Sequence, residues 1–167
     1  RRRDDPKVYE NDFRLNHIWV VDVASARATK VTSGAYTVSG VPNWSPDGKK
    51  LGFRASPTPM IRDERGNAYV VDVASLALDA ITITNDAESA PQFSPDGRTL
   101  AYRAMARPGF EADKFAIFLR DVATGQTRQI AANWDRSADT LQWSANGNTL
   151  YTTAGDVGQN RIFAIDT

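Results

Sequence analysis

The side chains with the clearest chemical potential are charged residues in and next to a predicted connection at Ala106–Lys114. This connection carries Arg107, Glu111 and Lys114, and Arg103 precedes it. A carboxylate or guanidinium held in a partly desolvated cavity binds an opposite charge through short, charge-assisted hydrogen bonds. These groups would therefore suit a charged ligand. Alternatively they are solvated, or they pair on the loop itself, as Glu111 and Lys114 could.

The sequence lacks the residue patterns that nucleophilic catalysis requires. Cysteine is absent, and the single histidine, His17, stands beside Ile18 and Trp19 in a strand-like segment, which favours a structural role. No G-x-S-x-G nucleophile elbow occurs in the sequence. We therefore expect no catalytic residue here, and we expect that the chain by itself hydrolyses nothing.

Four aspartates recur along the chain and resemble a metal-binding set: Asp22, Asp72, Asp121 and Asp166. They occupy equivalent places in successive repeats, so they should lie far apart, and each is better placed to cap the turn that follows it. No Gly-rich phosphate-binding loop and no calcium loop occurs either. We expect no metal and no cofactor.

The composition is typical of a folded, soluble protein. Of the 167 residues, 41% are hydrophobic and 24% are charged, and 20 basic side chains balance 20 acidic ones. A neutral chain has no broad basic field, which argues against a nucleic-acid partner. No run of about 18 apolar residues occurs, so no membrane-spanning segment is expected.

Two sequence elements repeat with the same period of about 50 residues. The element W/F-S-P-D-G ends on the glycines at 48, 97 and 147, where the third copy reads W-S-A-N-G. The element V-V-D-V-A-S at Val20–Ser25 returns at 70–75, 119–124 and, in part, 164–167. Two independent landmarks that share one period indicate a repeated structural unit.

Each repeat is predicted to contain four antiparallel strands. Short segments rich in β-branched and aromatic residues are bounded by turn residues, and no stretch has the apolar period of a helix. The proline, aspartate and glycine of the S-P-D-G element suit a tight hairpin turn. The strands are expected at 17–23 and 28–31; at 41–45, 50–55, 67–73 and 79–83; at 90–94, 99–105, 115–122 and 127–131; and at 140–144, 149–153 and 161–165.

A four-stranded repeat of about 50 residues is typical of a β-propeller blade. We therefore predict an all-β fold, a partial propeller of roughly three blades, with an all-β sandwich as the alternative. The recurring Trp44, Phe93 and Trp143 should form core between blades, whereas Trp134 is either a packing plug or a ligand wall. The predicted boundaries are a partial blade at 1–35, full blades at 36–86 and 87–136, and a partial blade at 137–167.

Propellers typically close with about four to eight blades. This arc should therefore be a fragment of a larger ring, which we favour, or a partner in an assembly that completes one. Its exposed blade edges would allow self-association. The connections at 56–66 and 106–114 are longer and more charged than the turns at the other end of the strands, and binding is expected on their face.

The S-P-D-G element followed by the I-W-V-V-D-V-A-S strand resembles the TolB-like propeller repeat. The wider pattern resembles the N-terminal propeller of the prolyl oligopeptidase family, in its dipeptidyl-aminopeptidase and acylaminoacyl-peptidase branch. The stretches that carry this resemblance are His17–Val23, Arg107–Lys114, and Trp134–Ser137 ahead of Trp143, and it extends over essentially the whole chain. It implies a serine peptidase as the parent protein, with a Ser-Asp-His triad on a separate C-terminal α/β-hydrolase domain that these residues do not include.

The resemblance also implies roles for the charged side chains. Acidic groups of the propeller hold the free amino terminus of the substrate in dipeptide-releasing relatives, and Glu111 is expected to do so here. Arg107 or Arg103 would hold a substrate carbonyl or carboxylate. The expected function is a non-catalytic propeller fragment that gates access to a serine exopeptidase and anchors the peptide end, and the parent is expected to be periplasmic or secreted. The alternatives are a non-enzymatic TolB-like propeller that binds proteins in the bacterial envelope, and a scaffold fragment of another propeller hydrolase.

Overall fold

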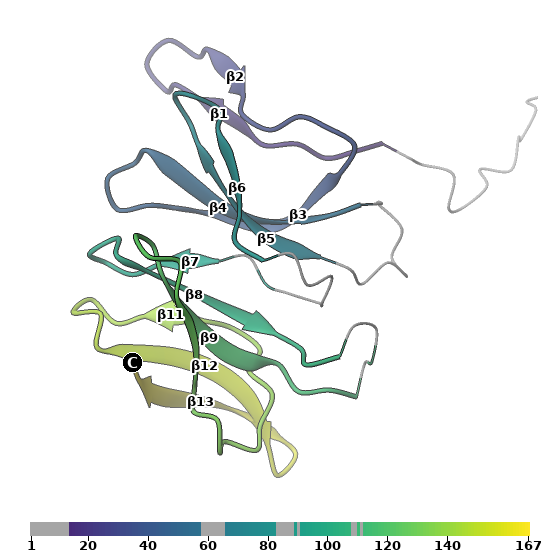
Figure 1. Ribbon diagram of the computed structural model, residues 1–167, viewed down its shortest axis with the longest axis vertical. Coiled ribbons are helices and arrows are strands. Elements are labelled where there is room, and N and C mark those ends of the chain that lie inside the picture. Colours follow the sequence, from purple (N-terminus) through teal and green to yellow (C-terminus); the bar gives the residue numbers. More distant parts are fainter. Residues whose placement is uncertain (1–13, 58–65, 83–88, 90, 108–109, 111) are drawn as a thin grey trace, which may run out of the picture.

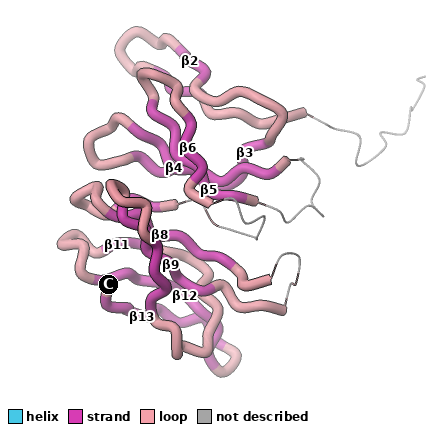
Figure 2. Tube along the Cα trace, in the orientation of Figure 1, coloured by secondary structure: helices cyan, strands magenta, loops and turns pink. Residues whose placement is uncertain are grey.

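The regular secondary structure of the described residues is entirely β. The computed structural model describes residues 14–57, 66–82, 89, 91–107, 110 and 112–167. Within these residues the strands form four separate antiparallel sheets that stack one after another in sequence order (Figures 1 and 2). None of the described segments forms a helix that could cross a lipid bilayer.

Strands follow one another within each sheet in the order of the sequence, so that each sheet is a simple meander. The first sheet holds β1 (Trp19–Val21) and β2 (Ala28–Lys30). The second holds β3 (Thr37–Trp44), β4 (Lys50–Ser56), β5 (Asn67–Asp72) and β6 (Leu78–Ala80). The third holds β7 (Gln92–Phe93), β8 (Thr99–Ala104), β9 (Ala116–Asp121) and β10 (Thr127–Ile130), and the fourth holds β11 (Gln142–Trp143), β12 (Thr149–Asp156) and β13 (Gln159–Asp166).

This arrangement confirms the predicted fold class, an all-β partial propeller whose sheets do not close into a ring. Every strand overlaps its predicted range, although β1, β6, β7 and β11 are shorter than expected and β3, β12 and β13 are longer. The four-stranded sheets have the short antiparallel ladders of propeller blades.

The S-P-D-G element forms the tight turn between the first and second strand of a sheet. In the second sheet the Ser45 hydroxyl donates to Asp47 Oδ1 at 2.6 Å and accepts the N–H of Lys50 at 2.9 Å. Gly48 supplies the positive φ of 70° that the turn requires. The same two hydrogen bonds recur in the third and fourth sheets, with Asn146 in place of aspartate in the last.

The hairpin of β12 and β13 is longer than the sequence predicts. Its ladder runs from Thr149 opposite Asp166 to Asp156 opposite Gln159, and a two-residue turn of Val157 and Gly158 closes it. Gly, Asp and Asn are disfavoured in strands, which is why the prediction ended earlier. Salt bridges to Asp156 hold this end together, from Arg136 at 2.7 Å and from Arg161 at 3.3 Å.

Apolar side chains pack between successive sheets. Phe93 and Trp143 are buried at the inter-sheet positions predicted for them, with 8% and 9% of their surface exposed. Trp44 was predicted to be core as well, and this prediction is wrong, because 45% of its surface is exposed. The physical reason is its neighbour: the first sheet contributes only two described strands, too few to cover the indole.

Stacking of the second and third sheets depends on a close approach at Gly52. A Cβ atom at this position would lie 2.7 Å from the Pro91 carbonyl oxygen, closer than such atoms come in proteins. Gly155, in the exposed part of β12, has nothing within 4 Å of the same position. The two glycines therefore form a matched pair, one packed against backbone and one open.

We predict that Gly52→Ala lowers the free energy of unfolding by about 1–3 kcal/mol, because the added methyl group forces two sheets apart. Urea denaturation of the purified chain measures the effect. Gly155→Ala is the control and should change stability by less than about 0.5 kcal/mol. Equal effects of the two substitutions would show that the sheets do not pack as described.

Candidate functional site

One cavity runs alongside the first strands of three successive sheets, β3, β7 and β11. These are the strands that face the central channel of a propeller. The cavity has a volume of about 750 Å³ and lies toward the end of the molecule where second strands lead into third strands. Its polar lining residues include Ser39, Arg54, Ser89, Gln92, Arg103 and Gln142.

Arg103 is a half-buried cation in the wall of this cavity. Its Nη1 group donates a hydrogen bond to the Ala138 carbonyl, and its guanidinium carbon lies 4.9 Å from the centre of the Phe115 ring. Burial lowers the pKa of Arg103, and the charge of Asp139 acts against that shift. A guanidinium has five N–H donors, and no carboxylate of the described residues forms a salt bridge with this one. Arg103 is therefore equipped to bind a carbonyl or carboxylate oxygen.

Arg54 brings a second guanidinium to the cavity from the equivalent place in the preceding sheet. Its Nη1 group donates to Ser39 Oγ at 2.7 Å and to Ser56 Oγ at 3.2 Å. Gly66 leaves room for the guanidinium, because a Cβ atom at that position would overlap it and displace the Arg54 side chain. Sequence analysis did not single out Arg54. The signal that could have found it is its offset of 49 residues from Arg103, which is the spacing of the repeats.

Two of the three side chains predicted to bind substrate lie in the described residues, and of these two the structure places Arg103 in the cavity wall. Arg107 is not among the lining residues. Its Nε donates to both carboxylate oxygens of Asp113, at 3.1 and 3.0 Å, and its guanidinium covers the Phe110 ring at 3.8 Å. This pairing raises the pKa of Arg107 and lowers that of Asp113. Glu111, the predicted anchor for an amino terminus, lies outside the described residues.

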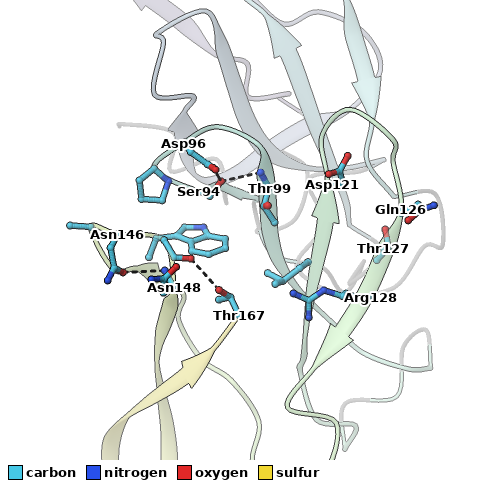
Figure 3. A pocket seen from close by; sticks show the side chains of 15 residues that line it. Ser94, Asp96, Thr99, Asp121, Gln126, Thr127, Arg128, Asn146, Asn148 and Thr167 are labelled. Carbon is cyan, nitrogen blue, oxygen red and sulfur yellow. Dashed lines mark hydrogen bonds between the residues drawn. The ribbon is translucent and has the colours of Figure 1, made fainter.

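A second hollow of about 660 Å³ lies at the opposite end, between the third and fourth sheets (Figure 3). Arg128 of β10 and the side chains of Trp143 and Thr167 contribute to its lining. One acidic residue that lines this hollow, Asp96, already takes part in a turn. Its carboxylate accepts a hydrogen bond from the Ser94 hydroxyl at 2.6 Å, and this bond lowers the pKa of Asp96. Because its acidic groups already serve local structure, we place the candidate site in the first cavity.

Three of the four repeated aspartates cap turns, as predicted. Asp121 Oδ1 accepts the Thr124 N–H at 2.7 Å and the Thr124 hydroxyl at 2.9 Å. Asp22 and Asp72 accept the same two groups from the serine three residues further on. Within the part of the chain that the structure describes, no group of three or more His, Cys, Asp or Glu side chains could hold a metal ion.

The aromatic candidates serve packing. His17 lies edge-on to Tyr36, with ring centres 5.6 Å apart, and its Nδ1 is 3.4 Å from Thr32 Oγ1. Trp134 packs edge-on against Phe163 at 5.2 Å, beside the core between the third and fourth sheets. The structural role predicted for His17 is thus confirmed, and of the two roles considered for Trp134 the packing role holds.

Comparisons by sequence connect this chain with peptidases. It is similar to dipeptidyl-peptidase 5 of Trichophyton equinum, with 45% identity over 38 residues, which is 23% of this chain and 5% of the relative. Dipeptidyl-peptidase 5 of Arthroderma otae is 38% identical over 50 residues, 29% of this chain and 7% of the relative. The chain thus covers only a small part of the length of these relatives. No protein-family model matches the chain.

Comparisons by structure show the fold. TolB from Acinetobacter baumannii superposes with a TM-score of 0.65 and 20% identity, over 90% of this chain and 35% of that one. Oligogalacturonate lyase from Vibrio parahaemolyticus gives a TM-score of 0.70 and 16% identity, over 90% and 45%. An acylaminoacyl peptidase from Pyrococcus horikoshii gives 0.57 and 13%, over 79% and 23%.

The sequence and structural likenesses agree with each other. The structure of TolB matches 90% of the chain, and the two curated sequences described above are dipeptidyl-peptidase 5 proteins. They confirm the resemblance indicated by the sequence, to a TolB-like propeller segment of a peptidase of the prolyl oligopeptidase type.

The capping role of Asp121 predicts a dependence of stability on pH. Hydrogen bonds from Thr124 lower the pKa of this carboxyl below its unfolded value of about 3.9. Its contribution to stability is therefore fully present above that value, and it is lost as the pH falls through the lower folded pKa. We expect Asp121→Asn to be less stable than the unaltered chain at pH 6, and to lose less stability between pH 6 and pH 3.

Urea denaturation at the two pH values measures this difference. Asp79→Asn, on the exposed strand β6, is the control and should lose as much stability between them as the unaltered chain does. An unchanged pH dependence in Asp121→Asn would contradict the capping role.

Proposed function

We propose that this chain is the substrate-facing part of the propeller of a longer peptidase, and that the cavity beside Arg103 receives one end of the peptide. The similarity to dipeptidyl-peptidase 5 supports a peptidase as the parent protein. The catalytic residues would then belong to a separate α/β-hydrolase domain, and the propeller would gate access to it and fix the position of the substrate.

The observation that carries this proposal is the environment of Arg103. Its guanidinium lies in a cavity on the channel side of three sheets, partly desolvated, with a neutral carbonyl as its hydrogen-bond acceptor. A charge-assisted hydrogen bond in such a setting is stronger than one in water. Arg103 would therefore hold a carbonyl or carboxylate oxygen of the peptide, and so fix the distance from that end of the substrate to the nucleophile.

Arg54 would add to the positive potential of the same cavity, because it lines the same wall one repeat earlier. Ser89, Gln92 and Gln142 supply neutral hydrogen-bonding groups around the two cations. This set suits an extended peptide, whose backbone carbonyl and N–H groups need partners along its length.

The loop that contains Arg107 would present the second anchor. Arg107 and Asp113 flank Glu111 in the sequence and form a salt bridge with each other, and Arg107 stacks on Phe110. We propose that Arg107 positions this segment rather than the substrate, and that the Glu111 carboxylate binds the free amino terminus of the peptide.

A non-enzymatic TolB-like binding protein is the second candidate. The likeness to TolB is a likeness of structure with 20% sequence identity, and at that level it shows the fold alone. The sequence similarity, by contrast, is to peptidases at 38–45% identity. The peptidase propeller is therefore the function that we favour.

We predict that Arg103→Gln, made in the longer protein, raises KM for peptide substrates roughly tenfold with little change in kcat, because it removes a hydrogen bond from a charged donor. Arg98→Gln, on a turn at the opposite end of the third sheet, is the matched control and should leave KM unchanged. Urea denaturation of both variants separates a binding role from a structural one. A KM that is unchanged in Arg103→Gln would contradict the proposal.

A second prediction concerns Glu111. In the longer protein, Glu111→Gln should reduce kcat/KM for substrates with a free amino terminus by about 10- to 100-fold, since the neutral amide loses the ion pair. Cleavage of the same peptides with an acetylated amino terminus should not fall. Equal activity of Glu111→Gln and the unaltered longer protein on free-amine dipeptide substrates would contradict the anchoring role.

A further inference from the structure

The first strand of the second sheet contains one residue more than the equivalent strands of the third and fourth sheets. Between its two stretches of ladder with β4, the three residues 40–42 lie opposite the single residue Phe53. In the third and fourth sheets the equivalent stretches lie between the bonded positions 89 and 92, and between 139 and 142, and each contains two residues. The irregularity in β3 is therefore a β-bulge with one additional residue.

Gly40 gives this bulge its conformation. Its φ of 76° lies in the left-handed region, which residues with a Cβ atom rarely adopt. Nothing lies within 4 Å of the place that a Cβ atom would take, so crowding does not account for the glycine, whereas the backbone conformation does. Bulges redirect the side chains that they carry and are frequent beside binding and active sites. The residue that follows Gly40 is therefore a candidate for a role in the cavity.

That residue is Val41, which lines the candidate cavity and has 84% of its surface exposed. The other aliphatic side chain among the described lining residues, Leu141, is buried, and the Phe115 ring lies beneath the Arg103 guanidinium. The lining comes from the second, third and fourth sheets, and none of it from the first sheet at the end of the stack. The exposed surface of Val41 is therefore part of the cavity wall, with room for a ligand beside it.

The wall combines this apolar surface with positive charge. Arg54 pairs with Ser39, the residue before the bulge, and Arg103 occupies the equivalent place in the third sheet. In ligand sites of this kind a few polar groups fix the orientation, and apolar contacts add affinity. An aliphatic group that covers Val41 removes apolar surface of both partners from water, whereas a polar group at the same place loses hydrogen bonds to water.

We propose that Val41 is a specificity-determining residue, which selects peptides with an aliphatic side chain next to the oxygen atom that Arg103 holds. This inference rests on the proposed function, because it takes the ligand of the cavity to be a peptide. The bulge supplies the specificity, since the third and fourth sheets lack the additional residue and, among the described residues, bring no exposed aliphatic side chain to the cavity. Arg103 holds the backbone of the peptide, and Val41 contacts one of its side chains.

Cleavage of paired peptides by the longer protein tests the proposal. The two peptides of a pair differ at one position near the bound end, where one has leucine and the other has asparagine, a polar residue of similar shape. We expect the unaltered protein to favour leucine by about tenfold in kcat/KM at one such position. Val41→Asn should remove most of this preference, and Val41→Ile should keep it. Val157→Asn is the matched control, because Val157 is 90% exposed on a turn outside the cavity, and it should leave the preference unchanged.

Binding of simple carboxylates separates this proposal from the proposed function, since it requires no cleavage. Acetate, butanoate and hexanoate are titrated into the longer protein and followed by ligand-observed NMR. We expect the affinity to rise about two- to fourfold with each added methylene group in the unaltered protein and in Val41→Ile, but not in Val41→Asn. Arg103→Gln should weaken the binding of all three acids by the same factor.

Two outcomes would overturn the role of Val41. One is a leucine preference that is absent from the unaltered protein or equal in Val41→Asn, and the other is an affinity for the three acids that does not depend on their length. Either result, together with weaker binding in Arg103→Gln, would leave the proposed anchor intact. Conversely, a length dependence that Val41→Asn removes, in a protein that cleaves no peptide, would support the Val41 contact and contradict the peptidase function.

Discussion

Burial of sheet faces between neighbouring sheets is the constraint from which the rest of this structure follows. A sheet of four short strands has apolar side chains on both faces, and only another sheet stacked on each face removes them from water. Each of the three apolar clusters accordingly draws side chains from two successive sheets. The approach is so close that Gly52 lies directly against the Pro91 carbonyl. Stacking at this distance brings the first strands of successive sheets together, and the candidate cavity runs along them.

The same stacking holds the candidate site in place. Arg103 lies in β8 of the third sheet, and its guanidinium donates a hydrogen bond to the carbonyl of Ala138, on the segment that leads into the fourth sheet. Phe115, which packs against the guanidinium, is tied to that segment as well, because its N–H donates to Ser137 Oγ at 3.0 Å. The cation is therefore held between two sheets and not on one free loop. A group fixed in this way loses little conformational entropy when a ligand binds.

The repeat period made the strands predictable, and departures from the prediction have local causes. The strands β7 and β11 are short because side-chain hydroxyls of Ser89 and Thr140 accept the N–H groups that a longer ladder would pair, which strand propensity does not register. Both strands of the β12–β13 hairpin were predicted, but its tight turn at Val157 was not, because a β-branched residue with a φ of 46° contradicts turn preferences. For the site, loop charge led to Arg103, whereas Arg54 required comparison of equivalent positions in two repeats.

Every hydrogen-bonded ladder in the described residues joins strands that are adjacent in the sequence. A sheet of this kind can form from its own 50 or so residues while the ribosome is still adding the next repeat, because no distant segment is needed to complete it. The same independence bears on how such proteins diversify. Duplicating or deleting one repeat alters two junctions between neighbours and no strand pairing, so the number of repeats can change over evolution while the binding face is kept.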